Sequence, residues 1–341
     1  MSMQLKPIPV LCFCALISAL LPHRGEARDL YDFAGTPLLE APVIVAESRE
    51  PVAIGNRIRI GFYNIENFSD GQDDGDQRTP ELAASQARLA AAIISEMDPD
   101  VLFLSEIENE QSLRMLNESL DRPYPEARVT SFSFDGQREK LNLGVLSRIQ
   151  PVSCVEIDFG AMMGPGRPPR GVLRTVFQLE DQSKLLVYTV HLKSNYGKSL
   201  RNESKRFNAL QLVRENADQM MDSESDTRWE VVVLGDMNVD PSLAKFQRDR
   251  SLAPFRDWTD LFLTTREEGW VTVPYRKSSP FRYEPAVFDR ILVSPELSRE
   301  PWTAGPPNVV TQGINTTDPG AIAGKGDHVS DHYPVYVDLQ R

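Results

Sequence analysis

The sequence predicts an α/β domain whose strands form a mixed sheet or two packed sheets. Strand-like and helix-like segments alternate from residue 57 onward without a long linker, and several strand-like segments follow one another directly. A simple parallel sheet does not explain such neighbouring strands, because parallel strands need long crossover connections. The 341 residues include 41% hydrophobic and 25% charged side chains, so we expect a large core rather than a disordered or fibrous chain.

Two segments have helical spacing, and the remaining apolar segments are short. Residues 81–97 follow the helix start signal Thr79-Pro80, and residues 199–221 form a longer helix candidate. Residues 101–105 are apolar and bounded by Asp-Pro-Asp, which indicates a buried strand. The other expected strands are residues 58–65, 143–146, 172–179, 185–192, 231–234, 287–293 and 335–339.

The first 27 residues have the pattern of a secretory signal peptide. Lys6 precedes an apolar run, residues 8–21, and small residues follow before position 28. The run is shorter than the roughly 20 residues that span a bilayer, which disfavours a membrane anchor. We expect a secreted or periplasmic protein with no transmembrane span in the mature chain, an extended leader over residues 28–55 and a domain over residues 56–341.

Charge and cysteine content narrow the classes of function. The formal net charge of −12 excludes binding of nucleic acid by bulk charge. Removal of residues 1–27 would take away two basic and one acidic residue, which makes the balance slightly more negative. It would also leave Cys154 as the remaining cysteine, so we expect no intrachain disulfide. The alternating residues around Cys154 predict a strand with a buried, unreactive thiol.

Polar residues interrupt or end the apolar strands at six places. Each of them alone can be a turn, a helix cap or a core histidine. Carboxylates at strand ends are costly unless they bind something, and α/β folds collect their sites there. Six such places in one chain therefore predict a single functional site. They are Asn64, Glu106, His191, Asp236 with Asn238, Asp289, and Asp331 with His332.

These segments resemble the endonuclease/exonuclease/phosphatase superfamily, which includes pancreatic-type deoxyribonuclease, abasic-site endonucleases, bacterial sphingomyelinases and inositol-polyphosphate 5-phosphatases. The resemblance covers residues 57–340. It implies a four-layered α/β sandwich, two packed mixed β-sheets flanked by helices, with the site at one edge. The segments that carry it are residues 62–67 (FYNIEN), 104–109 (LSEIEN), 190–194 (VHLKS), 235–238 (GDMN), 288–294 (FDRILVS) and 330–334 (SDHYP).

The resemblance implies hydrolysis of a phosphate ester by in-line attack of water with the help of a divalent metal. Mg²⁺ is the expected cofactor, and Mn²⁺ is the alternative. Glu106 corresponds to the main protein ligand of the metal. Asn64 corresponds to a neighbouring ligand or phosphate contact, and Asp331 to a further group that binds or supports the metal.

The same resemblance implies roles for the remaining site residues. Asp236 would orient or deprotonate the attacking water, and Asn238 would steady a phosphate oxygen. His332, oriented by Asp289, would contact the scissile phosphate or work with the attacking water. His191 would donate a proton to the leaving oxygen.

Two weaker features lie outside this set. Glu139, just before a strand, could supply a carboxylate that orients His191. An acidic stretch after the first strand has the spacing of a calcium-binding loop, but Pro80 and the preceding strand favour a flexible acidic loop, with a structural Ca²⁺ as the minor alternative. The positions in that spacing are Asp70, Gln72, Asp74, Gly75 and Glu81.

The substrate is less determined than the reaction, because loops set it. Residues 284–292 resemble inositol 5-phosphatases, whereas Val239-Asp240 departs from them and the His-Leu-Lys-Ser segment favours secreted nucleases. A nuclease on DNA or RNA is the leading interpretation, and no stable protein partner is expected. The alternatives are an inositol-phosphate phosphatase, a sphingomyelinase-like enzyme or a non-catalytic binding module.

Basic residues beside the motifs would form either a local cationic cleft or an ordinary solvated surface. They are Arg167, Arg170, Arg174, Lys193, Lys198, Arg201, Lys205, Arg206, Arg276, Lys277, Arg282 and Arg290.

Overall fold

The structure of the chain is a computed structural model. The predicted signal peptide lies outside its described residues, and so do three of the basic residues, Arg276, Lys277 and Arg282. Among the helices in the described part of the chain, none has both the length and the apolar character needed to cross a membrane. The described residues are 29–48, 55–264, 270–274, 284–318 and 320–341.

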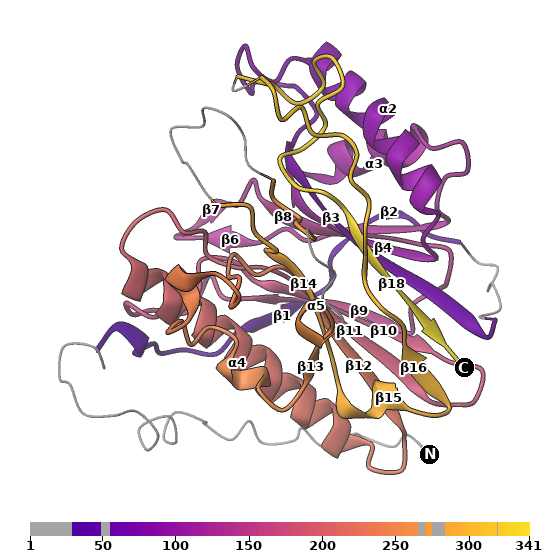
Figure 1. Cartoon of the computed structure of the whole chain (residues 1–341), viewed down its shortest axis with the longest axis vertical. Helices are drawn as coiled ribbons and strands as arrows, with labels where there is room; N and C mark the ends of the chain where they lie inside the picture. The colour runs from indigo at the N-terminus through magenta and orange to yellow at the C-terminus, as the bar shows by residue number, and fades with distance from the viewer. Residues whose placement is uncertain (1–28, 49–54, 265–269, 275–283, 319) are drawn as a thin grey trace, which may run out of the picture.

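Two large β-sheets form the centre of the molecule (Figure 1). The smaller sheet has the strand order β1 (Leu38–Glu40), β9 (Ser153–Asp158), β10 (Val172–Gln178), β11 (Lys184–His191), β12 (Trp229–Asp236), β14 (Asp289–Val293) and β13 (Thr259–Asp260). The larger sheet has the order β15 (Ser298–Arg299), β16 (Trp302–Ala304), β18 (Val335–Gln340), β3 (Arg57–Phe68), β4 (Val101–Ile107), β8 (Asn142–Ser147), β5 (Glu126–Val129) and β2 (Val43–Ala46), with β17 (Asn308–Val309) paired to β18. A separate ribbon pairs β6 (Ser133–Phe134) with β7 (Gln137–Arg138).

Helices cover the two outer faces, so the molecule is a four-layered α/β sandwich, as predicted. Apolar residues of α2 (Pro80–Met97) and α3 (Glu110–Glu118) pack on the larger sheet, and those of α4 (Ser199–Ser223) pack on the smaller sheet. Figure 1 shows α2 and α4 on opposite sides of the sheets. The shorter helices are η2 (Asp29–Tyr31), η3 (Ala244–Phe246), η4 (Ala253–Phe255), α5 (Leu261–Thr264) and η5 (Pro295–Leu297).

The two long helices and the nine strands that the sequence predicts are present, with small shifts at their ends. Thr79 caps α2 by accepting a hydrogen bond from the Leu82 amide at 3.4 Å, and Pro80 occupies the first turn. The apolar spacing did not predict α3, which has two turns. Its start is set by Asn109, whose side chain accepts from the amides of Gln111 and Ser112.

The inner faces of the two sheets meet in one apolar layer. Alternate residues of β3, including Ile58, Ile60 and Phe62, lie in this layer opposite Leu234 and Ile291 of the smaller sheet. Because side chains of a strand alternate between its faces, the next residues in each series point the same way. Polar residues replace apolar ones at those positions, so the end of this layer is lined by functional side chains.

The segment predicted as an extended leader contributes a strand to each sheet. In its described part, β1 pairs with β9 and β2 pairs with β5, both antiparallel. These strands are short and are stabilised by pairing with strands distant in sequence, which explains why the local sequence did not predict them.

Cys154 lies in β9, the strand predicted around it. Its Sγ atom is 3.5 Å from the hydroxyl of Thr175, and burial of the thiol raises the pKa of Cys154 to about 11. The thiolate is therefore scarce near neutral pH, in agreement with the predicted unreactive thiol.

Candidate active site

Three neighbouring strands of the smaller sheet bring their polar residues side by side. His191 at the end of β11 is the register partner of Asp236 at the end of β12. Asp236 is in turn the partner of Asp289 at the start of β14. Since β11 and β12 are parallel and β14 runs antiparallel to β12, a terminal residue of each meets the others at one edge.

The larger sheet contributes Asn64 and Glu106 from the parallel strands β3 and β4. Asn64 is the register partner of Ser105, and the register of this pair shifts just beyond it. Glu106 lies in the shifted region with a left-handed backbone, φ 66°. This conformation is uncommon for a residue other than glycine, and here it turns the carboxylate out of the strand alternation.

Contacts across the gap join the two sheets into one centre. The amide Nδ2 of Asn64 donates to Glu106 Oε1 at 3.2 Å and to Asp236 Oδ2 at 3.3 Å. The Nε2 atom of His191 lies 3.6 Å from Glu106 and 3.5 Å from Asp236. We call Asn64, Glu106, His191, Asp236, Asp289 and His332 the catalytic cluster.

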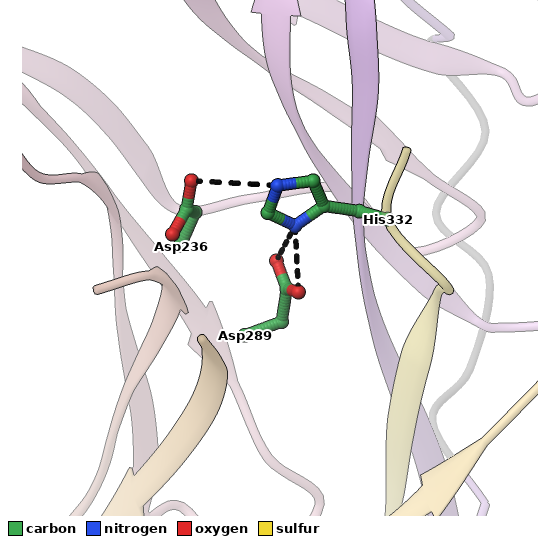
Figure 2. Close-up of side chains that lie close together, drawn as sticks. All are labelled: Asp236, Asp289 and His332. Carbon is green, nitrogen blue, oxygen red and sulfur yellow. Dashed lines mark hydrogen bonds and ion pairs between the residues drawn. The ribbon is translucent and has the colours of Figure 1, made fainter. Parts of the chain in front are cut away.

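His332 lies between two carboxylates, as Figure 2 shows. Its Nδ1 atom is 3.0 and 2.8 Å from the two oxygens of Asp289, and its Nε2 atom is 3.9 Å from Asp236 Oδ2. Nδ1 therefore carries the proton shared with Asp289, and Nε2 faces the centre. This is the pairing that the sequence resemblance implied.

The turn after β12 needs its glycine. At Gly235, φ is 148° and an added Cβ would lie 1.9 Å from the carbonyl oxygen of Val190. The close approach lets Asp236 and Asn238 face the same side. The Asn238 amide N–H donates to Asp236 Oδ1, and its side-chain Nδ2 donates to Asp236 Oδ2, both at 2.9 Å.

Two positioning residues were not predicted. The hydroxyl of Ser330 donates to the carbonyl of Asn64 at 2.6 Å and accepts from the amide of His332 at 3.0 Å. The hydroxyl of Thr272 accepts from the amide of Asp289 at 3.1 Å. Ser330 belongs to the Ser-Asp-His motif and could have been found there, whereas Thr272 lies in a segment with no local signal.

Burial and neighbouring charges give the two histidines opposite behaviour. Burial lowers the pKa of His191 well below the usual imidazole value, and the charges of Arg170 and His332 lower it further. Burial alone would also lower the pKa of His332, but Asp289 outweighs it and raises that pKa well above the usual value. His191 is therefore neutral and His332 is cationic near neutral pH.

The carboxylates are crowded. Burial raises the pKa of Asp236 to about 7, partly offset by the charge of His332. Burial also raises the pKa of Glu106, and the charge of Asp331 adds to this effect. Asp331 thus acts electrostatically on Glu106 from the loop before β18.

The donor set fits a divalent metal. Glu106 and Asp236 offer carboxylate oxygens, and Asn64 can offer its amide oxygen once the side chain rotates; hard cations prefer these ligands. In the structure Asn64 Nδ2 faces both carboxylates and its Oδ1 accepts from the Glu66 amide. The neighbouring donors and the charge of His332 compensate the two carboxylates only in part, because burial still raises both pKa values. Asp289 and His332 can also group with Asp236 around an ion, but their mutual hydrogen bond already engages His332 Nδ1.

The structure does not bring Glu139 to His191. The backbone of Glu139 bonds to Phe132 and Asn142 at the β6–β7 ribbon. Within the described residues no contact joins its carboxylate to His191, whose Nδ1 atom is buried without a hydrogen-bond partner. Glu139 directly follows the β6–β7 ribbon, a placement that linear spacing does not reveal.

The basic residues divide into buried structural groups and a set near the catalytic cluster. Arg206 and Arg290 are buried, and they pair with Asp249 and Asp260 respectively, so they are not part of a cationic rim. Arg170 donates to the backbone carbonyls of His191 and Leu192 at 3.4 and 3.2 Å, which places its guanidinium beside the catalytic cluster.

A basic pocket lies next to Arg170 along the chain. It has a volume of about 410 Å³ and is lined by Arg167, Arg201 and Lys205 together with Phe134 and Met163. Arg167 pairs with Asp135 at 3.1 Å. In the described part of the protein, the side chains of Arg201 and Lys205 have no ion pair. Burial lowers the pKa of Lys205, and the charges of Arg167 and Arg201 lower it further.

Comparison with solved structures identifies the same fold. TDP2 from D. rerio, solved in complex with a single-strand DNA product, has a TM-score of 0.57 and 18% identity over 84% of this chain and 100% of its own. Mannosyl-6-phosphatase Bt3783 from Bacteroides thetaiotaomicron VPI-5482 has a TM-score of 0.57 and 18% identity over 83% and 100%. An endonuclease/exonuclease/phosphatase family protein from the same species has a TM-score of 0.56 and 17% identity over 86% and 96%.

A comparison with curated proteins finds no match. A comparison with family models, in contrast, identifies the family from the sequence. The family model for the endonuclease/exonuclease/phosphatase family matches residues 61–332, a span that includes the whole catalytic cluster. The chain therefore belongs to the endonuclease/exonuclease/phosphatase family, whose members are metal-dependent phosphoester hydrolases.

Proposed function

We propose that the protein is a Mg²⁺-dependent phosphodiesterase that cleaves DNA or RNA. The observation that carries this choice is the pocket in which Arg201 and Lys205, without ion pairs among the described residues, lie with Arg167 on the segments that flank His191. A second negative charge on the substrate would neutralise these cations. Nucleic acid offers such a charge at every neighbouring phosphate, whereas a simple phosphomonoester does not.

Two short stretches of chain connect the pocket to the catalytic cluster. Arg167 lies three residues before Arg170, whose guanidinium contacts the backbone of His191. Arg201 and Lys205 lie in the first turns of α4, which begins eight residues after His191. An anion bound there would belong to the same substrate as a phosphate at the catalytic cluster.

The catalytic cluster supports attack of water on a phosphate ester. Asp236, whose pKa of about 7 is set by burial, orients the attacking water and accepts its proton. Cationic His332, held by Asp289, donates a hydrogen bond from Nε2 to the phosphate, and Asn238 steadies a phosphate oxygen.

Neutral His191 acts as a hydrogen-bond donor to the leaving oxygen rather than as a full acid, because burial disfavours its protonated form. Asn64 and Glu106 would hold the metal, with Asp331 adding a nearby carboxylate. The bound metal supplies neutralisation of the charge that grows on the phosphoryl oxygens.

A panel of substrates tests the proposal. The protein would be incubated with DNA, RNA, a phosphoinositide, sphingomyelin and a sugar phosphate, each with Mg²⁺, with Mn²⁺ and with a chelator. We expect metal-dependent cleavage of DNA or RNA and none by the His332→Ala variant. Cleavage of phosphoinositide or sphingomyelin alone would replace the nuclease by the corresponding phosphohydrolase. No metal-dependent turnover of any ester would leave a binding module.

Charge reversal in the basic pocket tests the substrate class separately. Arg201→Glu with Lys205→Glu should raise KM for an oligonucleotide at least about tenfold, since two phosphate contacts are lost. The same variant should hydrolyse a small chromogenic phosphodiester at the wild-type rate, because that substrate does not reach the pocket. Equal losses on both substrates would contradict a role of this pocket in binding the strand.

We also propose that the protein is exported to the periplasm or the medium. The pattern of residues 1–27 supports this proposal. Expression of the full chain followed by N-terminal sequencing of the product tests it. A start near residue 28 in the exported fraction is expected, and an intact N-terminus with all protein in the cytoplasm would contradict it.

A further inference from the structure

Three carboxylates outside the catalytic cluster converge between two segments that are distant in sequence. Asp70 and Asp74 lie in the loop between β3 and α2, and Glu108 follows β4. One carboxylate oxygen of each lies within 4.8 Å of the others. We call these three residues the loop carboxylate cluster.

Two oxygens of this cluster are buried without a hydrogen-bond partner among the described residues. They are Asp74 Oδ2 and Glu108 Oε2. The Asp74 side chain is only 6% exposed, so water compensates little for the lost hydration of Oδ2, while Oδ1 is paired with Lys140. A desolvated carboxylate oxygen without a donor is costly, and a bound cation is the usual remedy.

Lys140 compensates only the outer side of the loop carboxylate cluster. Its Nζ atom is 2.7 Å from Asp74 Oδ1 and 2.8 Å from Glu108 Oε1, while its side chain is 66% exposed. The oxygens without a partner, Asp74 Oδ2 and Glu108 Oε2, are the other atoms of the same two carboxylates. Among the described residues Lys140 pairs with Asp74 and Glu108 and no ion pair reaches Asp70, so one ammonium group stands against three carboxylates.

The cluster is built on a fixed frame. The Asn109 amide donates to Asp70 Oδ2 at 3.0 Å, and the Gln72 backbone N–H donates to Asp70 Oδ1 at 2.9 Å. The Glu108 amide donates to the carbonyl of Phe68 at 2.9 Å. Asp70 and the backbone of Glu108 are therefore held in place by groups that would remain if Lys140 moved away.

We propose that Asp70, Asp74 and Glu108 bind a Ca²⁺ ion that takes the place of the Lys140 ammonium group. The donors are all oxygen and come from an irregular loop, which suits the variable coordination of Ca²⁺ better than the strict octahedron of Mg²⁺. The site differs from the calcium-loop spacing in the sequence, because Glu108 from another segment replaces Glu81. Glu81 lies instead in the first turn of α2.

The ion would join the β3–α2 loop to the end of β4. Those segments also carry Asn67, whose amide donates to Glu106 Oε2 at 2.7 Å, and Glu106 itself, two residues before Glu108. Ca²⁺ at this site therefore braces the backbone beside the catalytic cluster without contacting the substrate.

Calorimetric titration of the full chain with CaCl₂ tests the proposal, with Mg²⁺ in excess so that the catalytic metal does not contribute. We expect one saturable site in the wild type and a higher Tm in the presence of Ca²⁺. Asp74→Asn should weaken Ca²⁺ binding about tenfold or more, since the loss of one charged ligand costs about 1.4 kcal/mol per tenfold in Kd. Asp73→Asn, an exposed position in the same loop, is the matched control and should bind Ca²⁺ like the wild type.

Lys140→Met provides an independent test that leaves all three metal-binding carboxylates in place. This variant loses the competing ammonium group, so it should bind Ca²⁺ several-fold more tightly than the wild type. Absence of Ca²⁺ binding in both the wild type and Lys140→Met would overturn the proposal and leave a lysine-bridged carboxylate cluster. Equal weakening in Asp73→Asn and Asp74→Asn would also overturn it. Neither result depends on phosphodiesterase activity.

Discussion

The catalytic cluster and the loop carboxylate cluster lie close in sequence, yet they hold negative charge in different ways. Glu106 is surrounded by groups from both sheets, including the amide of Asn64 and the ring of His191. Glu108, two residues later, meets only loop carboxylates and the exposed Lys140 within the described residues. A carboxylate between the sheets therefore gains partners from several strands, whereas a carboxylate in a loop depends on a single counter-ion.

The largest expected effect is on kcat, which should depend on the catalytic cluster and not on Lys140 in the loop carboxylate cluster. His332→Ala removes the cation that faces Asp236, so kcat on the cleaved ester should fall about 10²–10⁴-fold, the usual contribution of such a group. Lys140→Ala should leave kcat unchanged, because among the described residues the Lys140 ammonium group pairs only with Asp74 and Glu108. Comparable losses in the two variants would show that the clusters act as one unit.

Substitution of a glycine should also destabilise the protein more beside the catalytic cluster than in the acidic loop. Gly235→Ala places a Cβ 1.9 Å from the carbonyl of Val190, so we expect a loss of about 3 kcal/mol or more in the free energy of unfolding. Gly75, in the acidic loop, also has a positive φ, but nothing lies within 4 Å of an added Cβ. Gly75→Ala should cost only about 1 kcal/mol. Urea unfolding of the two variants measures the difference.

Removal of one positioning hydroxyl should have an intermediate effect. Ser330→Ala leaves the carbonyl of Asn64 and the amide of His332 without their shared partner, at a cost of about 1–3 kcal/mol. We expect kcat to fall more than KM changes, because the two side chains lose their relative position. Asn109→Ala is the comparison, since it removes a helix cap worth about 1 kcal/mol and should leave kcat unchanged. A similar kcat in the wild type, Ser330→Ala and Asn109→Ala would contradict the positioning role of Ser330.

The smallest expected effect is the change in stability when Lys140 no longer pairs with Asp74 and Glu108. With a chelator present, Lys140→Ala should lower the free energy of unfolding by about 0–1 kcal/mol, since exposed ion pairs contribute little. With Ca²⁺ present, the variant should become more stable than the wild type, because no ammonium group competes for the carboxylates. Thermal melts in both conditions show whether the order of stability reverses.

The sequence predicted the long elements and every residue of the catalytic cluster, because both have local signals. Thr79-Pro80 marks the start of α2, and polar residues at strand ends mark His191 and Asp236. The same reasoning did not find β1 and β2, which are short strands stabilised by distant partners. It assigned Glu139 to His191 by spacing, whereas no contact among the described residues joins the Glu139 carboxylate to His191.

Composition by itself excluded binding of nucleic acid by bulk charge, and the motifs predicted the family and the candidate catalytic residues. The tertiary structure decided which charges matter. It buried Arg206 and Arg290 in ion pairs, left Arg201 and Lys205 beside a pocket, and joined Glu108 to Asp70 and Asp74. Strand alternation and local turns are encoded by neighbouring residues, but compensation of a charge depends on groups that only folding brings within a few ångströms.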